Sequence, residues 1–369
     1  MTPRPHPLRR RLVRVVIGLV VAVVAIAGVG WIVLTSSPTP GALIIRSALN
    51  SQSATTLKAM EKHAAGVENV AVVRDRRYMA GPAAALLDVY TPTVGTSATT
   101  PAPSTTTPET RTRYPIVVWI HGGGWLAGDK ADAAPYFELI ASKGFAVVSV
   151  NYSLAPEHHY PGPVVEINHA LGYLRSHAAA LHLDPSRIML AGDSAGAQLA
   201  SQVAALTTNP AYATDLGIEP TLPASALRGT VLDCGVYDAS PFSAGSKDAP
   251  KGPLGFAVAT LMWAYAGTKD KASPIFRQMS TINDITAAFP PTFITGGNTD
   301  PLTAGQSKPL AAKLRRLGVP VTTRFFPDDH EPKLEHEYQF DLDTADGRAT
   351  LDATIAFLRQ VSSPPLSSS

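Results

Sequence analysis

The sequence predicts an α/β fold in which helices cover both faces of a mostly parallel central sheet. Short apolar, β-branched runs alternate with helical patterns along most of the chain, as in the succession 115–120, 133–143 and 145–150. Strands of a parallel sheet are buried on both faces and therefore read as continuous apolar runs. The 369 residues, 45% of them hydrophobic, are enough for a large core, and one α/β domain can extend to this length.

The N-terminal segment carries a candidate membrane anchor. Residues 15–34 form an uncharged apolar run, which as a helix spans a hydrocarbon core of about 30 Å. Arginines but no acids precede it in residues 1–14. The positive-inside rule therefore predicts a basic cytoplasmic N-terminus, a transmembrane signal-anchor helix and an extracytoplasmic body. The alternative is a signal peptide cleaved near Ala27, which releases the same body as a secreted protein.

A linker and an N-terminal helix are expected over residues 35–75, before the main domain at 76–369. Apolar positions recur at helical spacing between residues 43 and 65, which predicts a helix there. Residues 91–112 include 16 Thr, Ser or Pro residues and no aromatic residue. Such a segment cannot bury apolar surface, so we expect a loop between strands.

Each remaining element is predicted from its length and period. Strand patterns are short and β-branched, whereas helix patterns are longer with apolar residues three and four apart. Parallel strands all end at one edge of the sheet, where polar residues from distant loops meet. Strands are expected at 69–74, 85–90, 115–120, 145–150, 187–191, 228–233, 291–295 and 320–326, and helices at 133–143, 163–180, 195–207, 255–266, 303–317 and 345–361.

Composition excludes several functional classes. The single cysteine, Cys234, rules out a disulfide framework and a cysteine-based zinc cluster. Without the first 40 residues, the chain has 26 basic and 29 acidic side chains. This mildly acidic body argues against nucleic acid as a partner.

The string GDSAG (192–196) joins a strand pattern to a helix pattern. A G-x-S-x-G string in that context predicts a nucleophile elbow, in which small residues allow a sharp turn and expose Ser194 at the strand end. The helix N-terminus behind the serine favours developing negative charge. The alternative interpretation is an ordinary glycine-rich turn between a strand and a helix.

A second glycine-rich string, HGGGW (121–125), also follows a strand pattern. Consecutive glycines leave backbone N–H groups unhindered, which suits an oxyanion hole, where each donor contributes about 3–4 kcal/mol. The competing interpretations are a flexible turn or a phosphate loop, although the string lacks the motifs of nucleotide sites. His121 is expected to hold the loop in shape rather than to titrate in catalysis.

A nucleophilic serine needs a histidine base and a carboxylate that orients the histidine. Asp300 follows strand 291–295 and is the candidate acid, with an N-cap of the next helix as its alternative role. Two histidines come after the last strand. His336 is preferred as the base, and His330 is the second choice.

Five motifs occur in a family-specific order: HGGGW, NYSLAPEHHYP, GDSAG, GNTDPL and HEYQF. In this combination, over about residues 76–361, the chain resembles the hormone-sensitive-lipase-like carboxylesterases of the α/β-hydrolase fold. The resemblance implies an α/β-hydrolase fold without cofactor or metal. It implies a triad of Ser194, Asp300 and His336, and oxyanion donors on Gly123, Gly124 and Ala195.

The chain departs from the family pattern at the base, where His336-Glu337-Tyr338 replaces the common His-Gly-Phe. Family members also cover the site with a cap, which here is expected from residues 43–65, 208–227 and 236–280. Large apolar side chains in the last of these segments are candidates for an acyl pocket or for simple core packing. They are Phe242, Phe256, Met262, Trp263 and Tyr265.

Together these patterns predict a serine carboxylic-ester hydrolase that forms an acyl-enzyme on a small ester substrate. One alternative is an acyltransferase or amidase that acts on cell-envelope material. Another is a non-catalytic binding module on the same fold.

Overall fold

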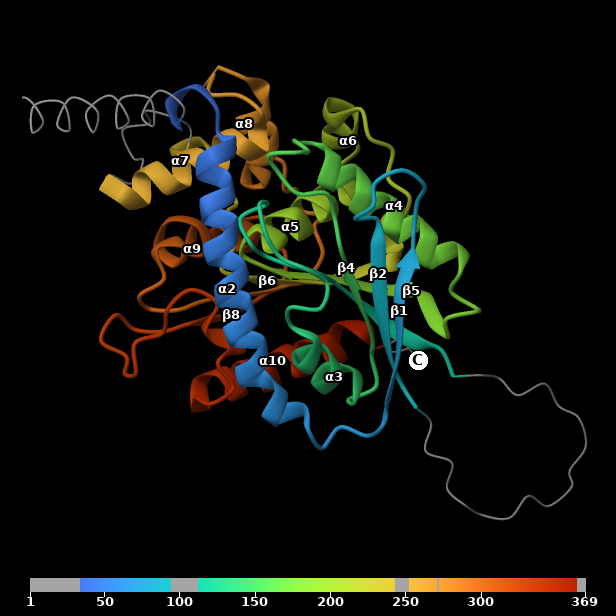
Figure 1. Ribbon diagram of the computed structural model, residues 1–369. Helices are drawn as coiled ribbons and strands as arrows, with labels where there is room; N and C mark the ends of the chain where they lie inside the picture. The colour runs from blue at the N-terminus through green and yellow to red at the C-terminus, as the bar shows by residue number, and fades with distance from the viewer. Residues whose placement is uncertain (1–33, 94–111, 243–251, 271, 364–369) are drawn as a thin grey trace, which may run out of the picture.

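The computed structural model describes residues 34–93, 112–242, 252–270 and 272–363 (Figure 1). One eight-stranded sheet runs through it in the order β1-β2-β4-β3-β5-β6-β7-β8. Its strands are β1 (Val70–Arg77), β2 (Leu86–Pro92), β3 (Tyr114–Ile120), β4 (Ala146–Val150), β5 (Leu183–Asp193), β6 (Leu227–Asp233), β7 (Thr292–Gly296) and β8 (Val321–Phe325). The helices are α2 (Thr39–Ala64), α3 (Ala134–Ala141), α4 (Gly162–Ser176), α5 (Ser194–Thr208), α6 (Pro210–Leu216), α7 (Gly252–Ala266), α8 (Pro274–Met279), α9 (Lys308–Arg316) and α10 (Ala345–Ser362).

The sheet is mostly parallel, as the sequence predicts. Strands β3 to β8 pair in parallel, whereas β1 and β2 pair antiparallel with each other and β2 pairs antiparallel with β4. Successive residues of β3 belong to two different core clusters. Ile116 and Val118 pack with α4 and α5 on one face, and Val117 and Trp119 pack with α3 and α10 on the other. This double burial explains the unbroken apolar run of β3.

Several elements differ from the sequence prediction. Strand β5 extends well beyond 187–191, and the helix expected at 303–317 is a π-helical turn, Thr303–Ser307, followed by α9. Helices α6 and α8 lie where a loop-rich stretch was expected. Each has six or seven residues, too few for a visible period, and each is capped by a side chain, for example Asn209 at the start of α6.

Helix α2 covers the edge of the sheet where the parallel strands end (Figure 1). Arg46 attaches it there, because its guanidinium donates to the main-chain oxygens of Leu126 (2.6 Å) and Ala155 (2.5 Å) and pairs with Glu157. The predicted anchor 15–34, apart from Leu34, lies outside the described residues. Within those residues, no helix has the length and apolar character needed to cross a membrane.

Candidate active site

A strained turn at the end of β5 presents Ser194. Its φ of +50° lies in the left-handed region, which side chains other than glycine rarely adopt. A Cβ on Gly196 would lie 2.0 Å from the Ile120 oxygen, and one on Gly192 would lie 2.5 Å from Gly196 C. Because neither position has room for a side chain, helix α5 can follow the strand directly. The strand–turn–helix context predicted for the nucleophile elbow is therefore present.

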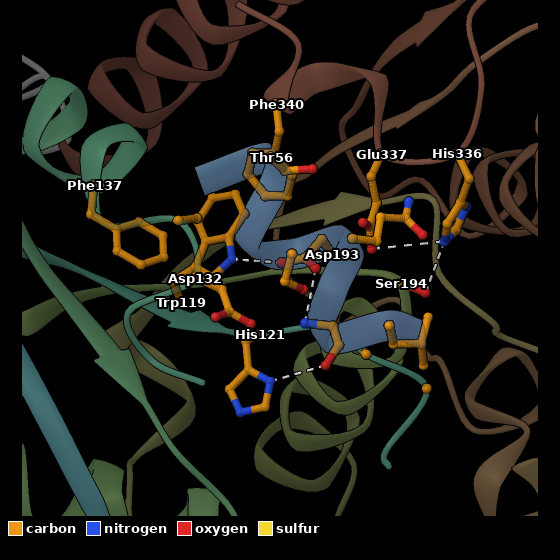
Figure 2. A pocket seen from close by; sticks show the side chains of 17 residues that line it. Thr56, Trp119, His121, Asp132, Phe137, Asp193, Ser194, His336, Glu337 and Phe340 are labelled. Carbon is orange, nitrogen blue, oxygen red and sulfur yellow. Dashed lines mark hydrogen bonds and ion pairs between the residues drawn. The ribbon is translucent and has the colours of Figure 1, made fainter. Parts of the chain in front are cut away.

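His336 joins the serine to an acid (Figure 2). Its Nε2 lies 2.9 Å from Ser194 Oγ, and its Nδ1 lies 3.2 Å from Asp300 Oδ2. A proton on Nδ1, facing the carboxylate, leaves the Nε2 lone pair free to accept the serine hydroxyl proton. The structure thus brings together the three residues predicted as a triad, although they lie 106 and 36 residues apart along the chain.

Hydrogen bonds connect the loop that carries the acid with the loop that carries the base. The Thr299 N–H and hydroxyl both donate to the Leu334 oxygen, at 3.0 and 2.8 Å. Asn298 Oδ1 accepts from Leu334 N–H at 2.8 Å. A Cβ on Gly297 would lie 2.1 Å from the Leu334 oxygen, so only glycine allows this approach. The residues before Asp300 therefore hold its loop against the loop of His336.

Both roles considered for Asp300 are present. Its Oδ2 faces His336, and its Oδ1 accepts the Leu302 N–H at 2.9 Å at the start of the following helical turn. The carboxylate is buried and held from two sides. His330, the second choice for the base, instead contacts Asp346 Oδ2 at 2.9 Å and packs against Phe326.

The HGGGW loop lies beside Ser194 with positive φ at Gly123 (+92°) and Gly124 (+59°). A Cβ on Gly123 would lie 2.3 Å from the Ala127 oxygen, so the tight turn requires glycine. Within the described part of the chain, neither glycine N–H donates a hydrogen bond. The Ala195 N–H lies in the first turn of α5, where helix geometry provides no partner. Three backbone donors are thus available next to the serine.

His121 has the structural role expected from the sequence. It is buried, stacks on the Tyr152 ring at 4.4 Å, and has its Nδ1 2.9 Å from the Gly122 oxygen. Burial lowers the pKa of His121, which favours the neutral ring. The Tyr152 hydroxyl donates to the His121 oxygen at 2.9 Å, so NYSLAPEHHYP supports the glycine loop.

Comparison with known proteins agrees with this architecture. The family model of the alpha/beta hydrolase fold matches residues 117–331, more than half of the chain. The chain belongs to the α/β-hydrolase family. Carboxylesterase NlhH of Mycobacterium tuberculosis is 32% identical over 63% of this α/β hydrolase and 68% of its own length. Bovine hormone-sensitive lipase is 36% identical over 31% of the chain, which confirms the predicted resemblance.

A solved structure, an inhibited esterase B from Lactobacillus rhamnosis, superposes with a TM-score of 0.67 at 22% identity, over 86% of this chain and 97% of that one. At this identity the likeness supports the fold alone. This α/β hydrolase spans between 34% and 68% of the length of the first curated relatives that it matches, and 15% of bovine hormone-sensitive lipase.

The electrostatics of the hydrolase site raise the pKa of His336. Burial lowers its pKa, but the neighbouring Cys234 sulfur, the Asp300 carboxylate and the Glu337 charge raise it further, so the net pKa lies well above the usual value. Glu337 Oε1 is 3.8 Å from His336 Nε2. An imidazolium that forms when the ring accepts a proton is therefore stabilised.

Cys234, Asp300 and His336 are the described residues whose grouping could hold a metal ion, with ligand atoms all within 4.8 Å. Asp300 and His336 already face each other. Burial raises the pKa of the Cys234 thiol to about 12, so the thiolate that a metal requires is costly to form. The donor set therefore fits a metal poorly.

A cavity of about 100 Å³ opens beside Ser194 (Figure 2). Helix α2 forms one wall through Leu49, Gln52, Ser53 and Thr56, so the predicted cap contribution of residues 43–65 is confirmed. The aromatic side chains that line the cavity are Trp119, Phe137 and Phe340, none of which lies in the segment 236–280 that held the predicted candidates.

The acyl-pocket candidates of the segment 236–280 do not line this cavity. Tyr265 instead stacks on Trp125 of the glycine loop at 4.8 Å, and Leu261 packs so closely on Gly124 that a Cβ there would lie 2.6 Å away. Helix α7 thus supports the loop from behind. The alternative of core packing holds for Met262 and Tyr265, which are buried, and for Phe242, which packs against the core, whereas Phe256 is exposed.

Proposed function

We propose that this α/β hydrolase cleaves carboxylic esters through an acyl-enzyme on Ser194. The observation that carries the proposal is the series of contacts from Ser194 Oγ to His336 Nε2 (2.9 Å) and from His336 Nδ1 to Asp300 (3.2 Å). The esterase names of its relatives support the same activity.

In the acylation step, His336 Nε2 accepts the hydroxyl proton while Ser194 Oγ attacks the ester carbonyl. Negative charge develops on the carbonyl oxygen, and the N–H groups of Gly123, Gly124 and Ala195 stabilise it. Asp300 keeps the ring in the productive tautomer. His336 then gives its proton to the leaving alkoxide, which departs as the alcohol.

In the deacylation step, a water molecule takes the place of the alcohol. His336 accepts a proton from the water as its oxygen attacks the acyl carbonyl, and returns a proton to Ser194 Oγ when the acid leaves. The small cavity favours esters with a short chain, because typical ligand sites measure about 300–1,000 Å³.

Replacing Ser194 with Ala tests the proposal. We expect kcat/KM for p-nitrophenyl butanoate to fall by about 10⁴-fold or more with an unchanged circular dichroism spectrum. Turnover of the ester by the Ser194→Ala variant would contradict the proposal.

Separate His336→Ala and His330→Ala variants locate the base: the first should lose activity and the second should keep it. Products formed with competing alcohols or amines distinguish hydrolysis from acyl transfer or amide chemistry.

We also propose that residues 15–34 anchor the chain in a membrane with the catalytic domain on the extracytoplasmic side. The apolar run and the preceding arginines support this orientation. Fractionation of cells that express the full chain, followed by protease treatment of intact cells, tests it. We expect membrane-bound protein that external protease degrades. Soluble full-length protein, or protection of the domain, would contradict the orientation.

A further inference from the structure

Acidic side chains surround the cavity beside Ser194. Asp132, Asp193 and Glu337 line it together with polar residues of α2, and the lining formed by the described residues contains no lysine or arginine (Figure 2). The acidic side chains of the lining therefore face no lysine or arginine among the described residues. Among the described residues of the lining, the other titratable groups are His121, which is buried beside the glycine loop, and His336 itself.

Glu337 provides the accessible negative charge. Its side chain keeps 27% of its surface exposed, and its single ion-pair contact is His336 Nε2 at 3.8 Å. No hydrogen bond joins its carboxylate to another described residue. Glu337 stands where the common His-Gly-Phe pattern has glycine.

Two buried acids near Glu337 have no lysine or arginine partner among the described residues. Burial, and then the charge of Glu337, raise the pKa of Asp193, and the same two causes raise the pKa of Asp233 to about 8. Neither oxygen of the buried Asp233 has a hydrogen-bond partner among the described residues. These acids bring no positive charge to Glu337, whose one ion-pair partner among the described residues is His336.

His121 also lines this cavity, but its Nε2 is enclosed by the protein. His121 is 5% exposed, and its Nε2 has no hydrogen-bond partner in the described chain. Because Nδ1 faces the Gly122 oxygen, the proton of the neutral ring belongs on Nδ1, and Nε2 carries a lone pair. What the cavity offers a substrate is therefore the partly exposed carboxylate of Glu337, which suits a group that brings positive charge.

We propose that the cavity binds a small cationic group of the ester substrate, with the Glu337 carboxylate as its counter-charge. This inference rests on the proposed esterase function and names a substrate class for it. An ammonium beside Glu337 gives this partly buried carboxylate a direct ion pair, closer than its 3.8 Å contact with His336 Nε2. It lies next to the nucleophile, so binding there places the ester carbonyl near Ser194 Oγ.

Pairs of isosteric esters test the proposal. On the acyl side, methyl 3-aminopropanoate is compared with methyl butanoate, in which a methyl group replaces the ammonium. On the alcohol side, butanoylcholine is compared with 3,3-dimethylbutyl butanoate. Each kcat/KM is divided by the rate of hydroxide-catalysed hydrolysis of the same ester, which removes the inductive effect of the charge.

We expect the cationic ester to be preferred about fivefold or more in one of the two pairs, with a preference that declines as salt increases. Glu337→Gln should remove most of this preference. Glu335→Gln is the matched control, since it removes an exposed carboxylate of the same loop outside the cavity, and it should keep the preference. Equal turnover within both pairs, or a preference that survives Glu337→Gln, would overturn the inference.

A binding measurement keeps this test separate from that of the esterase function. Calorimetric titration of Ser194→Ala with propylammonium needs no turnover, and we expect binding that Glu337→Gln weakens. Absent binding overturns the cation site even if neutral esters are hydrolysed. Binding without hydrolysis of any ester by the wild-type chain would instead contradict the proposed function and leave the cation site supported.

Discussion

The Asp193 carboxylate accepts a hydrogen bond from the Gly122 N–H at 2.8 Å, across 71 residues of sequence. Its second oxygen accepts the Trp119 indole N–H, also at 2.8 Å. Asp193 directly precedes the nucleophile, and Gly122 directly precedes the glycines that offer oxyanion donors. One buried side chain therefore sets the position of the oxyanion loop relative to Ser194.

Asp193→Asn should lower kcat by about 10- to 100-fold while KM changes little. An amide provides one acceptor oxygen where the carboxylate provides two, so either Gly122 or Trp119 loses its partner and the glycine loop shifts. Steady-state kinetics with a short neutral ester measure the effect. If the variant instead loses thermal stability and keeps its kcat, the contact serves folding alone.

Arg46→Ala should reduce kcat/KM by about 3- to 10-fold, because the guanidinium holds α2 against the Leu126 and Ala155 oxygens beside the active site. The Glu157 pair is largely exposed and contributes little. Glu157→Gln, which keeps both carbonyl contacts, is the control and should retain nearly full activity. If the two variants lose activity equally, the carbonyl contacts are not the cause.

The pH profile should reflect the raised pKa of His336. Only the neutral imidazole accepts the serine proton, so kcat/KM should rise with pH and level off above the pKa of the free enzyme. That midpoint should lie above the usual histidine value of about 6.5. Glu337→Gln removes one of the charges that raise the pKa and should move the midpoint to lower pH. A shift to higher pH would contradict this account.

Gly196→Ala should prevent folding or lower stability severely, because the added Cβ would meet backbone oxygens of Ile120 and His121 that cannot move without disturbing β3. Gly305→Ala is the matched control. A Cβ there meets no atom within 4 Å on an exposed turn, so thermal unfolding should change by a few degrees at most.

Much of the fold and of the candidate site could be predicted from the sequence. The apolar runs locate the strands, and the motifs place Ser194 and Asp300 just after strands and His336 in the loop that follows the last strand. These segments meet because the carboxyl ends of parallel strands lie at the same edge of the sheet. His336 could be preferred over His330 only by its position, since both follow the last strand. The structure separates them, because His330 contacts Asp346 instead.

The remaining features depend on contacts between distant residues. The GNTDPL motif does not reveal that Asn298 and Thr299 bond to Leu334, and Arg46 lies in a helix with no sequence signal for its partners. In the sequence, the apolar residues of 236–280 fit an acyl pocket and simple core packing equally well, and only the structure shows that α7 supports the glycine loop. The sequence shows that Glu337 departs from the family pattern, but only the fold places it in a cavity lined by acidic residues.

The central claim is that Ser194 becomes acylated, and mass spectrometry of the digested protein tests it most directly. The wild-type chain is mixed with p-nitrophenyl butanoate, quenched in acid within the burst, and digested. The account predicts one butanoyl group per chain on the peptide that contains Ser194, and none on that peptide in the Ser194→Ala or His336→Ala variants. Turnover without a trapped acyl group there, or acylation at another residue, would contradict it.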